Sequence, residues 1–377
     1  MTGSPESHIV VRQQDIANVA LSPDGHTLAS LNWGDRIIRL WNLTIDPAVE
    51  SRVLSSNQGD AALAIAFSPH DHTLISAGKD RSVLLWNLKD RDNKPIAEPQ
   101  VLGKFGKPDD IVSAMILSPD GHTLASTSAD HTIRLWDTTH PQVEPRVLRG
   151  HEDTVLAFAF SPDSRTLASA GKDRSIRLWD LTNAAPKPQM LGKHDDTVST
   201  LAFSSDGHIF ASAGADHTIR LWDLTNPTTE PRVLSGHKNA VLALAFSPNN
   251  HTLASAGKDR SIRLWDLTNP SAEPQILKLK KERDDVFSAL AFSSDSHTLA
   301  SASEDSVIYL WDLSAPTAEP RVFRGHDGIV SMLTFSPDGH TLASASADRT
   351  IRLWRTQIND LLELACHYAG RNLTREE

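Results

Sequence analysis

Eight tryptophans recur in the same short local sequence, and this repeat constrains the fold more than any other feature. Each follows an apolar run such as Ile-Arg-Leu, and all but the last precede Asp or Asn. They are Trp41, Trp86, Trp136, Trp179, Trp222, Trp265, Trp311 and Trp354, with spacings of 45, 50, 43, 43, 43, 46 and 43 residues. A period of about 40–45 residues with a Trp-Asp signature is typical of a β-propeller, with one four-stranded blade per repeat. A ninth tryptophan, Trp33, fits no such slot.

Within one repeat, the pattern of apolar runs and turn residues predicts four strands. Arg146-Val147-Leu148 reads as the short outer strand of the preceding blade. Residues 154–160 (TVLAFAF) are almost wholly apolar, as expected for a strand buried on both faces. A Ser-Pro-Asp turn follows, then strands over residues 166–170 and 175–180, the latter carrying the tryptophan. The other repeats follow the same plan.

The two ends of the repeat array predict how the ring closes. Residues 8–12 (HIVVR) match the fourth-strand slot but precede the first repeat, while the last repeat stops after its third strand at Trp354. The expected fold is therefore an all-β, eight-bladed propeller closed by the N-terminal strand, with a short C-terminal helix. Its segments would be a flexible N-terminus (1–7), the propeller (8–355) and a helical tail (356–377). The tail carries an apolar stripe at helical spacing, Ile358, Leu361, Leu362, Leu364, Ala365 and Tyr368.

Composition narrows the class of protein. The single cysteine, Cys366, permits no internal disulfide and favours a reducing, cytoplasmic location. No apolar run approaches the roughly 20 residues of a membrane span, and the first residues lack the pattern of a signal peptide. A net charge of −10 disfavours nonspecific binding to nucleic acid or to anionic membranes. We expect no membrane insertion and no specific nucleic-acid partner.

These repeats resemble the WD-repeat (WD40) family over about residues 8–355. The resemblance implies a side-chain network of His, Ser, Asp and Trp in a blade. Such chains suit their chemistry, because Trp only donates, Asp only accepts, and Ser and His do both. The matching sets are His151, Ser169, Asp173 and Trp179; His194, Ser212, Asp216 and Trp222; His237, Ser255, Asp259 and Trp265; and His326, Ser344, Asp348 and Trp354.

The other four repeats lack the Gly-His turn, so a complete network is in doubt there. Their aspartates remain, at Asp35, Asp80, Asp130 and Asp305. A Ser–His–Asp set could also suggest a hydrolase. Because the set recurs in repeat after repeat with no distinguished nucleophile, we predict a structural role and no catalytic residue.

Histidines at an equivalent turn of seven repeats raise the question of a metal site. They are His26, His72, His122, His208, His251, His297 and His340. Packed sheets lie about 10 Å apart, whereas two ligand nitrogens must each lie about 2 Å from one zinc ion. We therefore expect solvated turn residues, with no metal and no cofactor.

One face of the propeller is the expected partner surface. The irregular connections at residues 13–15, 55–61, 103–110 and 278–285 all precede a first strand, and Trp33 lies in a turn that shares this face. Exposed aromatic and basic residues there would anchor a protein or peptide. The candidates are Trp33, Lys79, Lys104, Phe105 and Lys107. Alternatively, Trp33 plugs the central channel or packs on its neighbouring loop. The lysine that recurs in alternate repeats (Lys79, Lys172, Lys258) would then only reflect repeat duplication.

The sequence favours a non-enzymatic, monomeric scaffold that binds a protein or peptide. Residues 365–377 (ACHYAGRNLTREE) resemble the C-terminal ends of large bacterial WD-repeat signalling proteins. This resemblance implies the sensing module of a bacterial signalling or NTPase-associated protein. Two alternatives stay open at this point: a propeller-fold enzyme with its site at the channel mouth, and a purely structural, self-associating scaffold.

Overall fold

The computed structural model describes most of the chain between residues 7 and 356. The described ranges are 7–12, 16–22, 27–32, 37–42, 52–55, 62–68, 73–78, 82–88, 99–104, 112–183, 185–226, 228–269, 271–277, 279, 286–315, 317–336, 338–348 and 350–356. Structural statements below refer to these residues. The expected tail helix over 356–377 lies outside them, except for Thr356. So does the expected flexible segment 1–7, apart from Ser7.

The described residues form eight antiparallel sheets of four strands each. The first four sheets are β2 (Ile16–Leu21), β3 (Thr27–Asn32), β4 (Ile37–Asn42) and β5 (Arg52–Ser55); β6 (Ala62–Phe67), β7 (Thr73–Gly78), β8 (Ser82–Asn87) and β9 (Gln100–Lys104); β10 (Val112–Leu117), β11 (Thr123–Ser128), β12 (Ile133–Asp137) and β13 (Arg146–Leu148); and β14 (Val155–Phe160), β15 (Thr166–Gly171), β16 (Ser175–Asp180) and β17 (Pro188–Lys193).

The remaining sheets repeat this order, and the last one also contains the first strand of the chain. They are β18 (Val198–Phe203), β19 (Ile209–Gly214), β20 (Ile219–Asp223) and β21 (Arg232–Leu234); β22 (Val241–Phe246), β23 (Thr252–Gly257), β24 (Ile262–Asp266) and β25 (Gln275–Leu277); β26 (Phe287–Phe292), β27 (Thr298–Ser303), β28 (Ile308–Asp312) and β29 (Arg321–Phe323); and β30 (Val330–Phe335), β31 (Thr341–Ser346), β32 (Thr350–Arg355) and β1 (Ser7–Arg12).

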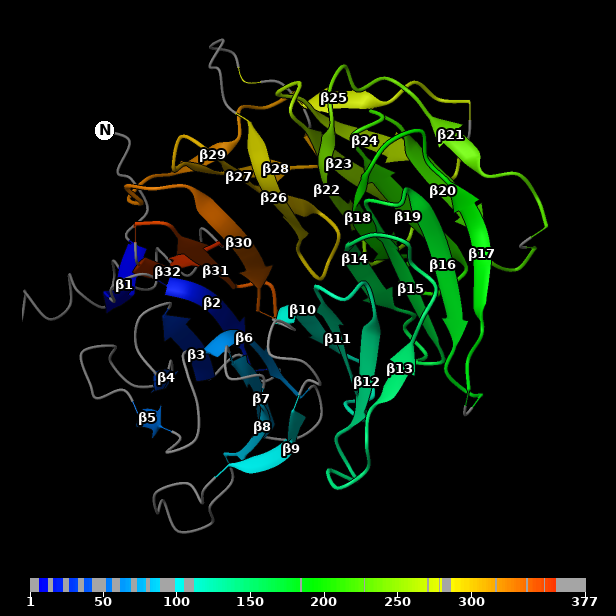
Figure 1. Cartoon of the computed structure of the whole chain (residues 1–377). Helices are drawn as coiled ribbons and strands as arrows, with labels where there is room; N and C mark the ends of the chain where they lie inside the picture. Colours follow the sequence, from blue (N-terminus) through cyan, green and yellow to red (C-terminus); the bar gives the residue numbers. More distant parts are fainter. Residues whose placement is uncertain are drawn as a thin grey trace, which may run out of the picture.

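The sheets are arranged as blades around a ring, with the first strand of each nearest the centre (Figure 1). The eighth blade is completed by β1, which pairs antiparallel with β32 from Ser7 opposite Trp354 to Arg12 opposite Thr350. The eighth blade then contacts the first through β31 and β2. The eight-bladed all-β fold and the closing role of the N-terminal strand are therefore confirmed.

The core lies between neighbouring blades. One cluster joins Leu135 and Leu148 of the third blade to Val155, Leu167 and Trp179 of the fourth. Six further clusters of this kind join other neighbouring blades. The second strand of a blade is buried on both faces, so its sequence is a run of small and apolar residues, such as TLASAG in β15.

Close approach between blades also requires particular side chains to be small or absent. A β-carbon at Gly192, in the outer strand β17 of the fourth blade, would lie 2.4 Å from Cη2 of Trp222 in the fifth. Polar contacts cross the seams as well, for example between the third and fourth blades. Arg146 at the start of β13 donates from Nη1 to the carbonyl oxygen of Asn183 at 3.0 Å. The packing of indole rings and hydrogen bonds between side chain and backbone thus both hold neighbouring blades together.

The strand order gives the ring two distinct faces. We call the tetrad face the one formed by the connections that precede first strands and by the turns between second and third strands; it carries His151 and Asp173. The turn face carries the Ser-Pro-Asp turns and the connections after third strands, including Asp120 and Thr138.

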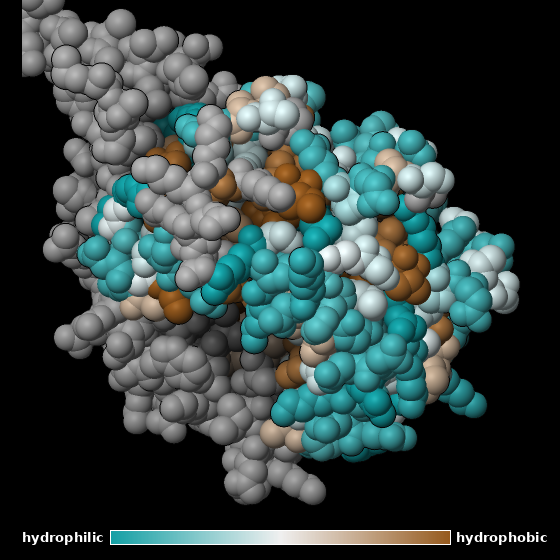
Figure 2. Space-filling model, turned by 90° about the horizontal axis from the view of Figure 1, so that it is seen from above, coloured by the Kyte–Doolittle hydropathy of each residue, from teal (hydrophilic) through white to brown (hydrophobic). Residues whose placement is uncertain are grey.

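The face of the molecule shown in Figure 2 is mostly hydrophilic where its residues are described. In Figure 2 the hydrophobic residues form separate patches among hydrophilic ones. Four of the outer strands, β13, β17, β21 and β25, each expose one apolar side chain at an equivalent position, namely Val147, Met190, Val233 and Ile276. Single exposed residues of this kind are normal for soluble proteins. The described part of the chain contains no helix able to span a membrane.

Removal of β1 should destabilise the ring, because β32 would then lose its outer partner and the eighth blade would have only three strands. We expect deletion of residues 1–14 to lower the melting temperature measured by circular dichroism. Deletion of residues 1–6, which leaves β1 whole, is the matched control. Equal melting temperatures for the two truncated chains would contradict the closing role of β1.

Candidate functional site

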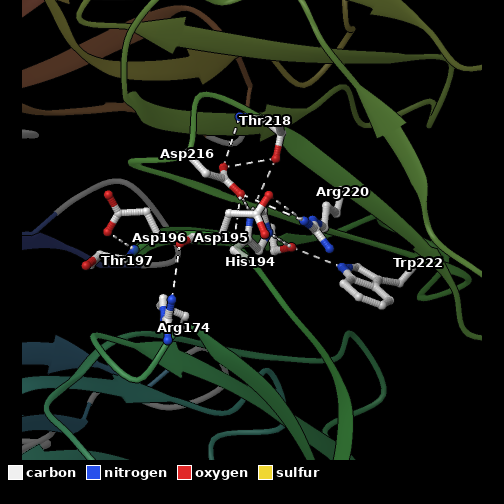
Figure 3. Close-up of polar contacts among 10 residues, drawn as sticks. Arg174, His194, Asp195, Asp196, Thr197, Asp216, Thr218, Arg220 and Trp222 are labelled. Carbon is white, nitrogen blue, oxygen red and sulfur yellow. Dashed lines mark hydrogen bonds and ion pairs between the residues drawn. The ribbon is translucent and has the colours of Figure 1, made fainter.

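The polar network of the fifth blade links four side chains from four different segments (Figure 3). Trp222 on β20 donates from Nε1 to Oγ of Ser212 on β19 at 3.0 Å. That hydroxyl lies 2.9 Å from Nε2 of His194, which stands in the connection before β18. Nδ1 of His194 lies 2.7 Å from Oδ2 of Asp216, in the turn between β19 and β20. The network thus joins the connection before β18 and the turn between β19 and β20 to the central strands of the blade.

The same arrangement occurs in the other three blades that carry the Gly-His sequence or its equivalent. The Trp–Ser distance is 2.8 Å in each, and the Ser–His distances are 2.7–2.8 Å. The shortest His–Asp distances are 2.8, 3.0 and 2.8 Å. These sets are His151, Ser169, Asp173 and Trp179; His237, Ser255, Asp259 and Trp265; and His326, Ser344, Asp348 and Trp354.

The chemistry of the groups sets the direction of this hydrogen-bond chain. The indole N–H of Trp222 can only donate, so Ser212 accepts there and has its own proton free for Nε2 of His194. A neutral histidine then carries its proton on Nδ1 and donates it to Asp216. Each tetrad is therefore a directed chain from Trp to Asp in which every polar group has a partner.

Two further groups in each tetrad were not anticipated from the sequence. A hydroxyl two residues after the aspartate donates to it, as Thr218 does to Asp216 at 2.9 Å, and the amide after the histidine donates as well. In the fifth blade Arg220 also lies near the carboxylates, with Nη2 3.8 Å from Asp195 and 4.0 Å from Asp216. The Asp-x-Ser/Thr spacing, present in all four repeats, is the sequence signal that could have shown the hydroxyl.

These contacts shift the titration of the tetrad. Burial alone would raise the pKa of Asp348, but hydrogen bonds from Thr350, the Asp327 amide and His326 lower it to about 2. The pKa of Asp216 is lowered below its usual range in the same way, by His194 and Thr218 against the effect of burial.

Burial has the opposite consequence for the histidines. It lowers the pKa of His151, His237 and His326, and the neighbouring aspartates only partly offset this effect. The folded protein therefore favours a neutral histidine beside an ionised aspartate.

The four blades without the histidine keep part of the network. In each of them the tryptophan still donates to a serine of the second strand: Trp41 to Ser30, Trp86 to Ser76, Trp136 to Ser126 and Trp311 to Ser301. In the third blade Asp130 accepts from Nη2 of Arg134 at 2.9 Å instead of from a histidine. The Trp–Ser pair is thus common to all eight blades.

The tetrads contain the residue types of a catalytic triad but not its accessibility. The exposed fractions of Ser169, Ser212 and Ser255 are 0%, and that of Ser344 is 2%. Each hydroxyl is also held by an indole N–H. A substrate carbonyl cannot reach such an oxygen, so these four serines act in the structure and not as nucleophiles.

The turn histidines lie apart from the tetrads. His122, His208, His251 and His297 are exposed on the turn face, and His340 is partly buried; His26 and His72 lie outside the described residues. Among the described residues, no group of three or more His, Cys, Asp or Glu side chains could hold a metal ion.

The expected partner-binding residues fall mostly where the structure gives no description. Trp33, Lys79, Phe105 and Lys107 lie outside the described residues, and of Lys104 only the backbone is described, as the last residue of β9. The proposed grouping of these side chains therefore stays a prediction.

Eight four-stranded blades, each with a tryptophan tied to a serine, define a β-propeller built from WD repeats. The family model for the WD domain, G-beta repeat, matches the chain eight times, at residues 4–42, 50–87, 100–137, 143–180, 187–223, 228–266, 275–312 and 318–355. The chain belongs to the WD40 family. It is also similar to the mouse "WD repeat-containing protein 90", with 36% identity over 90 residues. That match covers 22% of this chain and 5% of the relative.

Breaking one tetrad should cost stability. His194→Ala leaves the Asp216 carboxylate and the Ser212 hydroxyl without their buried partner, a loss of about 1–3 kcal/mol in the free energy of unfolding. The exposed His208 on the turn face offers the control variant His208→Ala, for which we expect a change within about 0.5 kcal/mol. Urea denaturation measures both, and equal midpoints would show that the tetrad adds no stability.

Stability should also fall on acidification. The pKa of His151, His237 and His326 is lowered on folding, so below pH 6.5 the unfolded chain binds more protons than the folded one. The free energy of unfolding should therefore decrease from pH 7.5 to 5.5. It should decrease again below pH 3.8 as aspartates such as Asp348, whose pKa is lowered to about 2, become protonated.

Urea midpoints at pH 7.5, 6.5 and 5.5 test the first decrease. The variant His326→Gln, which cannot titrate at this position, should show a smaller decrease than the unmodified protein. A midpoint that rises on acidification would contradict the assignment of neutral, buried histidines.

Proposed function

We propose that the chain is a non-enzymatic platform that binds a protein or peptide partner through its tetrad face. WD-repeat proteins are generally scaffolds of this kind. The observation that carries the proposal is that every complete tetrad anchors the connections of this face to the blade below, as His194 and Asp216 do in the fifth blade. A face held in this way can present variable connections in fixed positions.

The variable connections support the same face. Residues 56–61, 105–111 and 280–285 lie between an outer strand and the first strand of the next blade, and their sequences lack the histidine of the Gly-His connections. They contain the aromatic and basic residues Phe105 and Lys107. In propellers of repeated sequence, such departures from the repeat are where binding specificity is expected.

The burial of the tetrad serines argues against the enzyme alternative, because the residues most similar to a catalytic set cannot be reached. We further propose a monomeric, cytoplasmic protein that forms the sensing module of a bacterial signalling or NTPase-associated system. The single cysteine and the sequence of residues 365–377 support this part of the proposal. Light scattering distinguishes a monomer from a self-associating scaffold.

Affinity capture of partners from the native organism, followed by mass spectrometry, tests the proposed function. We expect the double variant Trp33→Ala, Phe105→Ala to lose at least ten-fold in recovery of a captured protein while its melting temperature stays unchanged. The control is Val143→Ala, which changes a 58% exposed side chain on the turn face. Full recovery with the double variant and loss with the control would move the binding site to the turn face.

A further inference from the structure

A cavity of about 210 Å³ lies between the second and third blades on the turn face. Its apolar lining comes from the second blade, from Leu85, which is partly exposed, and from Ile75, which is fully buried. Asp120, His122 and Thr138 of the third blade line the other side. Binding sites for drug-sized molecules measure about 300–1,000 Å³, so this cavity suits a smaller group.

The cavity has an identifiable origin in the sequence. Two residues after the tryptophan, other blades carry a leucine that packs against the core shared with the preceding blade, as Leu181 and Leu224 do. The third blade has Thr138 instead, and its Oγ1 donates to the carbonyl oxygen of Gly121 at 2.8 Å. The shorter side chain is thus turned toward its own blade and leaves the seam unfilled.

At comparable seams an arginine of the preceding blade crosses to the next blade, and no such arginine is present among the described residues of this seam. In the third blade Arg146, the first residue of the outer strand, donates to carbonyl oxygens of the fourth blade. The eighth blade also has a threonine, Thr356, but there Arg321 of the seventh blade donates to its carbonyl oxygen. The equivalent residue of the second blade is Gln100, which is exposed and makes no side-chain hydrogen bond with the described residues.

One carboxylate gives the cavity its charge. Oδ1 of Asp120 accepts from Oγ of Ser118 at 2.5 Å and from the amide of His122 at 3.0 Å. Ser164 of the fourth blade also contacts this residue: its hydroxyl accepts from the Asp120 amide at 3.0 Å and helps to stabilise the charged carboxylate. Burial alone would raise the pKa of Asp120, but these hydrogen bonds lower it, so the carboxylate is charged at neutral pH. A negative charge beside an apolar wall selects a cation with an aliphatic stem.

We propose that this cavity binds an alkylammonium or alkylguanidinium group, with its charge on Asp120 and its stem against the partly exposed Leu85. The group is supplied either by a free small amine or by a lysine or arginine side chain of a protein partner. The site lies on the turn face and does not depend on the function proposed for the tetrad face.

Calorimetric titration of the full chain with n-butylguanidinium and n-butylammonium tests the site, with butyrate as the probe of opposite charge. Two variants place in the third blade a residue that other blades already carry. Asp120→Asn keeps the turn, because Asn249 makes the same contacts in the sixth blade. Thr138→Leu restores the leucine found at Leu181. We expect each variant to weaken cation binding at least ten-fold and butyrate not to bind.

Matched controls change the same residue types elsewhere on the turn face. Asp163→Asn in the fourth blade and Thr356→Leu in the eighth should leave the affinity within two-fold. Unchanged binding in both Asp120→Asn and Thr138→Leu, or equal binding of butyrate, would overturn the site. Displacement of a captured partner by n-butylguanidinium would identify a protein side chain as the natural occupant. Recovery of an amine from the purified protein would identify a free one.

Discussion

The insertion of a tryptophan ring between neighbouring sheets, seen at seven pairs of blades, is the interaction on which the rest of the structure depends. Trp179, for example, packs against Leu135 and Leu148 of the preceding blade while its N–H is held by Ser169. The tryptophan ring therefore buries apolar area, and its N–H also has the acceptor that a buried indole requires. The Trp–Ser hydrogen bond recurs in all eight blades and fixes the third strand against the second.

Each blade has two apolar faces, and this explains why the array is a ring. A linear stack would leave one open face at each end, whereas contacts of the eighth blade with the first through β31 and β2 leave none. The tetrads then add a second level of order. They carry the fixed geometry outward from the Trp–Ser pair to the connections, so the loops of the tetrad face rest on a hydrogen-bonded support.

Much of this architecture was visible in the sequence. The first three strands of the fourth blade are placed to within one residue: the first begins at Val155 where residue 154 was expected, and the second ends at Gly171 where residue 170 was expected. The closure by β1 followed from an unmatched strand at one end and a missing strand at the other. These predictions were possible because the same pattern of strands and turns occurs eight times in one chain.

Contacts between blades were much harder to predict. The sequence shows that Thr138 replaces a leucine, but only the neighbouring positions of Ile75 and Leu85 reveal that the change leaves a cavity. The hydrogen bonds of Arg146 to the fourth blade and the Trp–Ser pairs of the blades without histidine likewise depend on distances across seams or strands. The expected roles of Trp33 and of the tail helix concern residues outside the described part and stay predictions.

The pairing of β1 with β32 has a consequence for the order of events during synthesis. Among the strands, β1 (residues 7–12) is synthesised first and its partner β32 (residues 350–355) last. The two strands can therefore pair only after the other strands have been synthesised. Throughout that interval a nascent strand with the sequence SHIVVR is without its partner, and the first blade has one uncovered side. The closing step therefore joins segments at the largest sequence separation in the fold, and any factor that occupies the early strand would delay completion of the whole ring.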